Sequence, residues 1–456
     1  MEIAGSILDL VGNTPLVRVP RLIQQEGLRC DVVIKMEQTN PGGSAKDRIA
    51  IAMIDDAERR GLIQPGGTIV EPTSGNTGVG LAIVAAQRGY RCVFVCTDKV
   101  SQLKVDLLRA YGAEVVVCPV AVAPEDPQSY YSTAERLVRE IPGAFRPNQY
   151  ANQKNPDAHF ETTGPEIWRQ TDGRVTHLVA GMGTGGTITG TARFLKSQNP
   201  DVVVVGADSE SSVYTGGSGR PYLVEGIGED FFPTTIDMSL VDVKLAISDE
   251  DSFLMARRLA RLEGILLGGS GGSAVAAALQ VAHTQSLGPD QLMVIVVPDS
   301  GRAYLAREYN DDWMASFGFI HREGRTVASV LEARGNQLPP LLFVNPDQKV
   351  RDAIELMRRN GVSQLPVCKN QPPFAAAEVA GALDELRLMD LVFRDPTVMD
   401  RTVGDVMGPK LPTVGIGEPL ELVVKRLDSS PAVLVLKGGR PAGVLTRTDV
   451  LTFLQA

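Results

Sequence analysis

Short runs of β-branched and apolar residues recur along roughly the first 310 positions, and stretches with helical periodicity follow them. The runs predict strands at residues 31–36, 68–71, 91–96, 114–118, 176–180, 202–205 and 293–297. Helical periodicity follows in stretches such as 101–111 and 251–263. Alternating strands and helices are typical of parallel sheets with helices on both faces, and this length is enough for two such lobes. We therefore predict an α/β domain over residues 1–318.

The pattern changes near residues 317–340, where charged residues and prolines replace the alternation, so 319–339 is predicted to be a linker. Residues 340–456 contain an internal repeat, because AGAL (380–383) and AGVL (442–445) each follow a helix-then-strand segment. We predict a C-terminal α+β module of two copies, about 340–397 and 398–456. One α/β domain with chance similarity is the alternative.

Composition and charge exclude several classes of protein. Hydrophobic residues make up 43% of the chain and charged residues 22%, which suits a large core, and the net charge of −9 argues against a nucleic-acid binder. No apolar run approaches the ~20 residues that span a bilayer, and the N-terminus does not resemble a signal peptide. We expect a cytoplasmic protein with no membrane or nucleic-acid partner. The five cysteines and four histidines show neither CxxC nor HExxH spacing, so we expect neither disulfides nor a metal.

Two glycine-containing turns between predicted strands and helices contain residues that could take part in catalysis or ligand binding. In NPGGSAKDR (40–48), Lys46 stands where a turn enters a helix, and a partly dry pocket there would lower its pKa, as a lysine that bonds to a carbonyl needs. A solvated first-turn lysine is the alternative. In EPTSGNTG (71–78), the polar side chains and free N–H groups suit a carboxylate, although such residues are also common in helix caps.

A third turn, GMGTGGT (181–187), suits a phosphate held by backbone N–H groups. It also contains GxGxxG (Gly181, Gly183, Gly186), and Asp208 ends the next strand, so an NAD oxidoreductase is an alternative. That alternative gives no role to Lys46 or to the TSGNT loop. Ser300, after the last strand, could hydrogen-bond a ligand ring or be a plain turn residue. Together these features predict a pocket for an amino acid joined to pyridoxal 5′-phosphate.

Residues from about 11 to 319 resemble the cysteine synthase and cystathionine β-synthase branch of the fold-type II pyridoxal-phosphate enzymes. The resemblance is carried by VGNTPLVR, GGSAKDR, EPTSGNTGVGLA, GTGGTITG and PDSGRAY. Residues 340–456 resemble a tandem pair of CBS regulatory domains, a Bateman module. The resemblance implies a fold-type II enzyme with two parallel-sheet lobes and a C-terminal α+β regulatory module.

The resemblance also implies roles for individual residues. Lys46 is expected to bond covalently to the cofactor and to move the α-proton, Asn76 to contact the ring hydroxyl, and Ser300 the ring nitrogen. Because a serine hydroxyl does not force ring protonation, the ring is a weaker electron sink, which favours elimination over transamination. The other expected positions are Gly183, Thr184, Gly185, Gly186 and Thr187 for the phosphate, and Thr73, Ser74, Asn76, Thr77, Gln149, Tyr150 and Gly226 for the substrate.

Within the branch, YLVEGIG (222–228) and Tyr150 resemble the cystathionine β-synthases. This likeness implies condensation of L-serine with L-homocysteine to L-cystathionine and water, with hydrogen sulfide production as a side reaction to consider. A cysteine synthase that uses O-acetylserine and sulfide is the alternative. Glu229 stands where some members have tyrosine. Animal members carry a haem-binding extension before the VGNTP segment, and only ten residues precede Val11 here, so haem is not expected.

The second copy of the C-terminal repeat contains Thr-x-x-Asp, Thr446 to Asp449, which in such modules often holds a ribose. The first copy has Asp384 where the threonine is expected. An adenosyl effector in the second copy is therefore a hypothesis, and a module that only joins subunits of a homodimer or higher homo-oligomer is the alternative. A non-enzymatic energy sensor is disfavoured because Lys46 and Ser300 are both present.

Overall fold

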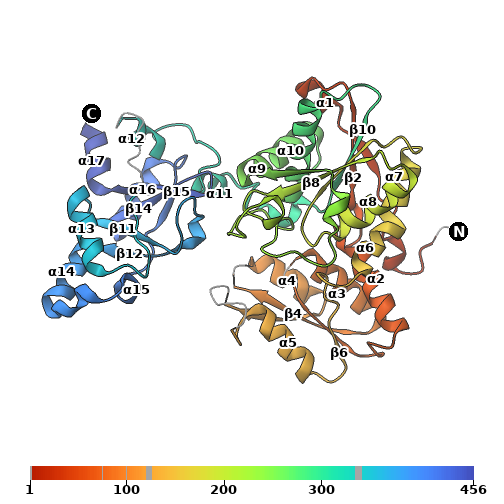
Figure 1. Ribbon diagram of the computed structural model, residues 1–456, viewed down its shortest axis with the longest axis horizontal. Helices are drawn as coiled ribbons and strands as arrows, with labels where there is room; N and C mark the ends of the chain where they lie inside the picture. Colours follow the sequence, from red (N-terminus) through yellow and green to blue (C-terminus); the bar gives the residue numbers. More distant parts are fainter. Residues whose placement is uncertain (1–2, 74, 99, 120–125, 334–340, 456) are drawn as a thin grey trace. The chain divides into compact units, whose positions relative to one another are not determined.

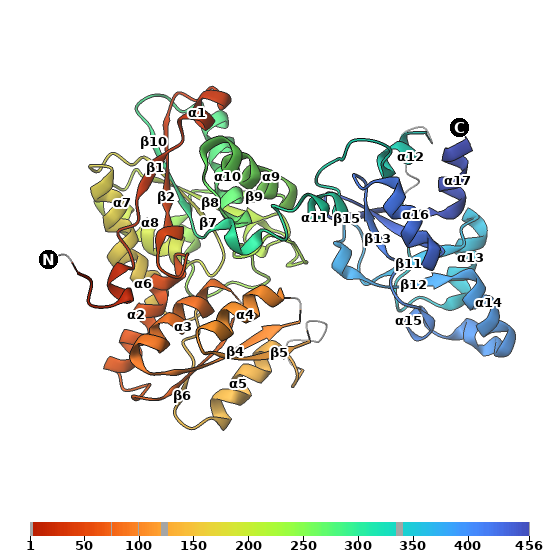
Figure 2. The same ribbon diagram turned by 180° about the vertical axis from the view of Figure 1, so that it is seen from behind.

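The computed structural model describes all residues except 1–2, 74, 99, 120–125, 334–340 and 456. The chain divides into two compact units. The first comprises residues 1–219 and 224–304, and the second comprises 220–223 and 305–456. Figures 1 and 2 show the chain from opposite sides.

The larger sheet of the first unit has six strands in the order β1-β2-β10-β7-β8-β9, and only β1 is antiparallel to its neighbour. The strands are β1 Leu16–Arg18, β2 Asp31–Met36, β7 His177–Gly181, β8 Val203–Ser209, β9 Val243–Ile247 and β10 Leu292–Val297. Helices α9 and α10 lie on one face of the sheet and α6, α7 and α8 on the other (Figure 1). These helices are α6 Lys154–Ala158, α7 Gly164–Gln170, α8 Gly186–Gln198, α9 Asp249–Glu263 and α10 Gly269–Thr284, and α1 is Pro20–Glu26.

The smaller sheet of this unit is fully parallel, with the order β5-β4-β3-β6. Its strands are β3 Thr68–Pro72, β4 Arg91–Thr97, β5 Glu114–Cys118 and β6 Ala144–Phe145. The accompanying helices are α2 Lys46–Arg59, α3 Asn76–Arg88, α4 Gln102–Ala110 and α5 Tyr130–Glu140. Apolar residues of α2 and α3 form a buried core with β3 and β4, so the start of each of these two helices is held firmly against the sheet.

The second unit contains the same arrangement twice. Its first half pairs β11 antiparallel with β12, and its second half pairs β14 antiparallel with β15. Val344 also bridges parallel to Val367, as β13 pairs parallel with β14. The elements are α11 Asp311–Ser316, α12 Val327–Ala333, α13 Val350–Asn360, β11 Gln364–Cys368, β12 Val379–Asp384, α14 Glu385–Arg394, α15 Val403–Val406, β13 Thr413–Gly415, α16 Leu420–Ser429, β14 Ala432–Lys437, β15 Arg440–Thr446 and α17 Arg447–Gln455.

The predicted fold class is confirmed: two mainly parallel sheets precede a C-terminal α+β module. Every predicted strand is present, with ends that shift by at most one residue, except that β8 continues to Ser209. The longer β8 contains Asp208, which lies beyond the apolar run at 202–205.

Three further observations apply only to the residues that the structure describes. Among them, no helix combines the length and apolarity needed to cross a membrane. Cys30, Cys92, Cys96, Cys118 and Cys368 are all free and buried. Within the same residues, no group of three or more His, Cys, Asp or Glu side chains could hold a metal ion.

Candidate active site

Lys46 is the first residue of α2, directly after the glycine turn that the sequence singled out. The turn is tied to the end of β10, because the amide of Ala45 donates to the carbonyl of Pro298 over 2.8 Å. Burial lowers the pKa of the Lys46 amine, and the charges of Glu229 and Asp299 oppose this effect. Nothing in the described part of the chain hydrogen-bonds or ion-pairs with its Nζ. The lysine is therefore positioned at a helix start with its amine uncommitted.

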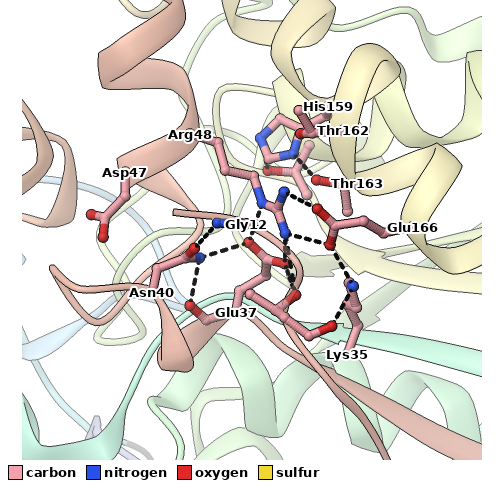
Figure 3. Close-up of polar contacts among 12 residues, drawn as sticks. Gly12, Lys35, Glu37, Asn40, Asp47, Arg48, His159, Thr162, Thr163 and Glu166 are labelled. Atoms are coloured by element: carbon pink, nitrogen blue, oxygen red, sulfur yellow. Dashed lines mark hydrogen bonds and ion pairs between the residues drawn. The ribbon is translucent and has the colours of Figure 1, made fainter. Parts of the chain in front are cut away.

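A buried network of charges fixes the same helix two residues further on, at Arg48 (Figure 3). The guanidinium of Arg48 is bidentate to two carboxylates: its Nε lies 2.7 Å from Glu37 Oε2, and its Nη1 lies 2.7 Å from Glu166 Oε1. Lys35 Nζ donates to Glu166 Oε2 over 2.7 Å. Burial by itself raises the pKa of Glu166, but Arg48 and Lys35 outweigh it and lower that pKa to about 2. Two cations and two anions thus neutralise each other near the start of α2.

The TSGNT loop joins the end of β3 to the start of α3. Thr73 and Thr77 are buried there, while Ser74 lies outside the described residues. Thr77 Oγ1 donates to Gln149 Oε1 over 2.6 Å, so the fold brings Gln149 beside the loop from 72 positions away in the sequence. The buried carboxylate of Glu71 holds that segment by accepting the amide of Gln149 at 3.1 Å.

Asn76 and Ser300 come together at the end of β10 through a residue that the sequence analysis missed. Asn76 Nδ2 donates to Asp299 Oδ2 over 2.8 Å, and the hydroxyl of Tyr304 donates to the same oxygen over 2.7 Å. Asp299 is buried, and burial raises its pKa. It therefore orients Asn76, and its neighbour Ser300 is half-buried next to it. The only signal in the sequence was its place inside PDSG, where a turn aspartate is common.

The phosphate loop follows β7 and opens α8 with Gly186. Its glycines cannot be replaced without displacing other groups. A Cβ on Gly183 would stand 2.4 Å from the carbonyl oxygen of Gly226, and one on Gly186 would stand 1.8 Å from Asn155 Oδ1. Gly185, at φ 84°, adopts a conformation that side chains rarely take. The bare backbone and the helix N-terminus form a cradle of N–H groups that fits a phosphate.

The two threonines of this loop are held by buried side chains that had no role in the sequence analysis. Asn155 Nδ2 donates to Thr184 Oγ1 over 3.0 Å, and His159 Nε2 lies 3.1 Å from Thr187 Oγ1. His159 Nδ1 lies 2.9 Å from Thr163 Oγ1. Burial lowers the pKa of His159 to about 3, so its ring is neutral and can orient the hydroxyl of Thr187. A lone histidine and asparagine gave no sequence signal for this role.

Tyr150 and Gly226 both lie beside the phosphate loop. The carbonyl of Tyr150 accepts the amide of Thr234 over 3.1 Å, and burial raises the pKa of its phenol well above the usual value, with Glu229 adding to the rise. Gly226, at φ 86°, is exposed and packs its carbonyl against Gly183. Residues 226–228 therefore lie against the phosphate loop, where the amide of Gly228 also donates to the carbonyl of Met182.

The acidic residue that favoured a dinucleotide, Asp208, is not available for one. Asp208 is fully buried, and its Oδ2 accepts a 2.9 Å hydrogen bond from Thr215 Oγ1. A carboxylate in that position cannot reach a ribose. The fit to pyridoxal phosphate is better, because a half-buried lysine with an uncommitted amine, a small-residue phosphate cradle and the Asn76–Asp299 pair occur in one unit.

In the second unit, Thr446 and Asp449 lie together at the start of α17. Asp449 Oδ2 accepts from the amide of Thr446 over 2.7 Å and from its hydroxyl over 2.9 Å. In the first half, Asp384 Oδ1 accepts the amide of Arg387 over 3.0 Å at the start of α14. Both acids therefore cap helices, and the threonine hydroxyl occurs in the second half alone.

Comparison with known proteins matches residues 7–299 to the family described as pyridoxal-phosphate dependent enzyme, and residues 337–372 and 403–456 to the CBS domain. The chain is 44% identical over 376 residues to the rabbit (Oryctolagus cuniculus) cystathionine beta-synthase, covering 80% of this chain and 68% of the relative. It is 36% identical to the enzyme of that name from Dictyostelium discoideum, covering 99% and 92%. A solved hydrogen sulfide-producing enzyme from Fusobacterium nucleatum has a TM-score of 0.63 and 37% identity, covering 67% of this chain and 99% of that structure.

Proposed function

Because the chain belongs to the pyridoxal-phosphate-dependent enzymes and carries CBS domains, we propose that it condenses L-serine with L-homocysteine to give L-cystathionine and water. A covalent role for Lys46 is supported by one observation: its amine, at the start of α2, is uncommitted. The choice of substrates is supported by the likeness to proteins named cystathionine beta-synthase, which in the Dictyostelium relative extends over 99% of this chain.

Pyridoxal phosphate, when bound, supplies an electron sink that acidifies the α-proton of serine and permits loss of its β-hydroxyl. In the proposed reaction Lys46 would hold the cofactor, remove the α-proton of serine and return a proton at the same carbon. The N–H groups of residues 183–187 would hold the cofactor's phosphate. Asn76, oriented by Asp299, would contact its ring hydroxyl, and Ser300 its ring nitrogen.

The substrate carboxylate would bind at the TSGNT loop. Thr77 and Gln149 are hydrogen-bonded to each other there, so these two side chains are oriented before substrate arrives. A preformed carboxylate site sets which face of serine is presented to Lys46. Tyr150 and Gly226 would close the pocket beside it.

A product assay by mass spectrometry on the full chain with added pyridoxal phosphate tests the proposal. Serine plus homocysteine is compared with O-acetylserine plus sulfide, each with and without S-adenosylmethionine. Dominant cystathionine supports the proposed reaction, and dominant cysteine formation from O-acetylserine refutes it in favour of a cysteine synthase. A change in rate with S-adenosylmethionine supports the proposed adenosyl site at Thr446 and Asp449.

A second activity is favoured by one comparison, since the Fusobacterium structure is that of a hydrogen sulfide-producing enzyme. We propose that cysteine can replace serine as the first substrate: homocysteine adds to its β-carbon to give cystathionine, and hydrogen sulfide leaves in place of water. With cysteine alone, a second cysteine or water adds instead. Sulfide release measured with cysteine alone and with cysteine plus homocysteine tests this proposal. No release above a Lys46→Ala control would refute it.

A further inference from the structure

Glu229 directly follows the residues that lie against the phosphate loop, and its backbone is fixed in place. Its amide donates to Ser212 Oγ over 3.1 Å, and its carbonyl accepts the amide of Val213 over 3.0 Å. One residue earlier, the amide of Gly228 donates to the carbonyl of Met182 over 2.7 Å. The backbone of Glu229 is thus held by the segment that follows β8, and its neighbour Gly228 by the residue that follows β7.

The carboxylate of Glu229 lies within electrostatic reach of two groups of the proposed site, because its charge acts on the Lys46 amine and on the phenol of Tyr150. It is half-buried, and no described residue hydrogen-bonds or ion-pairs with its carboxylate. Burial raises its pKa to about 8, and Asp230 adds to the rise while Lys46 opposes it. A carboxylate withdrawn from water without a counterion is costly for the free protein.

The cost is offset when a cation enters the pocket. The first amino acid has its carboxylate at the TSGNT loop and its amino group at the cofactor, so neither group needs Glu229. The second amino acid brings its own α-ammonium group to the pocket mouth, while inorganic sulfide brings none. An ion pair with a charge-assisted hydrogen bond is the strong interaction that this position offers.

We propose that Glu229 binds the α-ammonium group of the second amino-acid substrate and so makes the enzyme prefer a thiol amino acid over ammonium-free thiols. The inference rests on the proposed condensation of serine with homocysteine. It names the residue that would select the nucleophile, as distinct from the residues that hold the cofactor and the first substrate.

The test compares Glu229→Gln with the parent holoenzyme, using serine and three nucleophiles: homocysteine, 4-mercaptobutyrate, which is homocysteine without its α-amino group, and hydrogen sulfide. We expect the variant to lower kcat/KM for homocysteine relative to the ammonium-free thiols by about tenfold or more, through KM. Glu229→Asp should recover part of the preference. Asp230→Asn is the matched control: it removes an adjacent exposed carboxylate that raises the pKa of Glu229, so it should keep or strengthen the preference for homocysteine and never lower it.

An equal fall for all three nucleophiles would overturn the inference, because it would make Glu229 a general base or a structural residue. An unchanged ratio in Glu229→Gln, or an equal effect in Asp230→Asn, would also overturn it. A parent that forms no cystathionine at all refutes the proposed function itself, so the two failures are distinguishable. Cofactor absorbance and the unfolding midpoint of each variant, compared with the parent, identify a folding defect, and Glu229→Asp then decides the test.

Discussion

The buried ion-pair network around Arg48 predicts a large loss of stability when one of its carboxylates is removed. Glu166→Gln keeps the size of the side chain but removes the charge that faces Arg48 and Lys35. The carboxylate accepts from Lys35 Nζ at 2.7 Å, from Arg48 Nη1 at 2.7 Å and Nη2 at 2.8 Å, and from the amide of Asn13 at 2.8 Å. A glutamine turns its NH₂ group toward some of these donors, so at least one buried cation is left without an acceptor.

The magnitude can be worked out in two ways. Removing one partner of a buried ion pair typically costs about 3–5 kcal/mol, because an uncompensated charge remains. Independently, the fall of the Glu166 pKa from 4.5 to about 2 corresponds to about 3 kcal/mol of stability at neutral pH. The side chain is only 7% exposed, so solvent screening reduces this figure little. Both routes predict that Glu166→Gln lowers the free energy of unfolding by about 3–5 kcal/mol.

The lowered pKa of Glu166 also determines how the stability difference between parent and variant depends on pH. Because the pKa of Glu166 is lowered in the folded state, its contribution is fully present above pH 4.5 and is lost as the pH falls through 2. The difference between parent and variant should therefore shrink on acidification, by about half of the 3 kcal/mol at pH 3. A difference that stays constant from pH 7 to pH 3 would contradict the assignment of the effect to this carboxylate's charge.

Urea unfolding followed by tryptophan fluorescence measures this effect in the full chain. Of the two tryptophans, Trp168 lies in α7 with Glu166, so a Trp313→Phe background makes the signal specific to the first unit. Asp157→Asn is the control. That side chain is 27% exposed and pairs with Lys154 at 2.8 Å and Arg193 at 2.7 Å, and its loss should cost about 1 kcal/mol or less. Equal losses for the two variants, or a loss below about 0.5 kcal/mol for Glu166→Gln, would refute the reasoning.

Three further predictions follow from the sites. Lys46→Ala should abolish cystathionine formation in the mass-spectrometric assay while far-UV circular dichroism stays unchanged, and retained turnover would refute the role of the lysine. Gly186→Ala places a Cβ 1.8 Å from Asn155 Oδ1 and should weaken cofactor binding about tenfold or more, measured by equilibrium dialysis, whereas unchanged binding would disprove the cradle. Asp449→Ala should abolish the heat of S-adenosylmethionine binding in calorimetry, and Asp384→Ala should not, because Thr446 accompanies Asp449 alone.

Much of the fold could be predicted because its signals are local. Buried parallel strands are continuous apolar runs, so β2 and β5 have the predicted ends, and the glycine turns mark where helices begin. A strand of two residues such as β6 leaves no such pattern. The site residues that were missed act across long sequence separations: His159 reaches Thr187 only because α8 packs beside the π-helical turn His159–Thr163. Local periodicity carries no information about such contacts.

The two kinds of buried carboxylate in the first unit explain how the lysine can stay reactive. In the network, Glu166 is ionised because its pKa is lowered to about 2, and its charge is fully used by Arg48 and Lys35. Of the two acids whose charges act on Lys46, burial raises the pKa of Glu229 to about 8 and also raises that of Asp299. Near neutral pH Glu229 is therefore partly protonated. Fewer anions then hold the lysine as an ammonium ion, and burial can lower its pKa, as attack on a carbonyl requires.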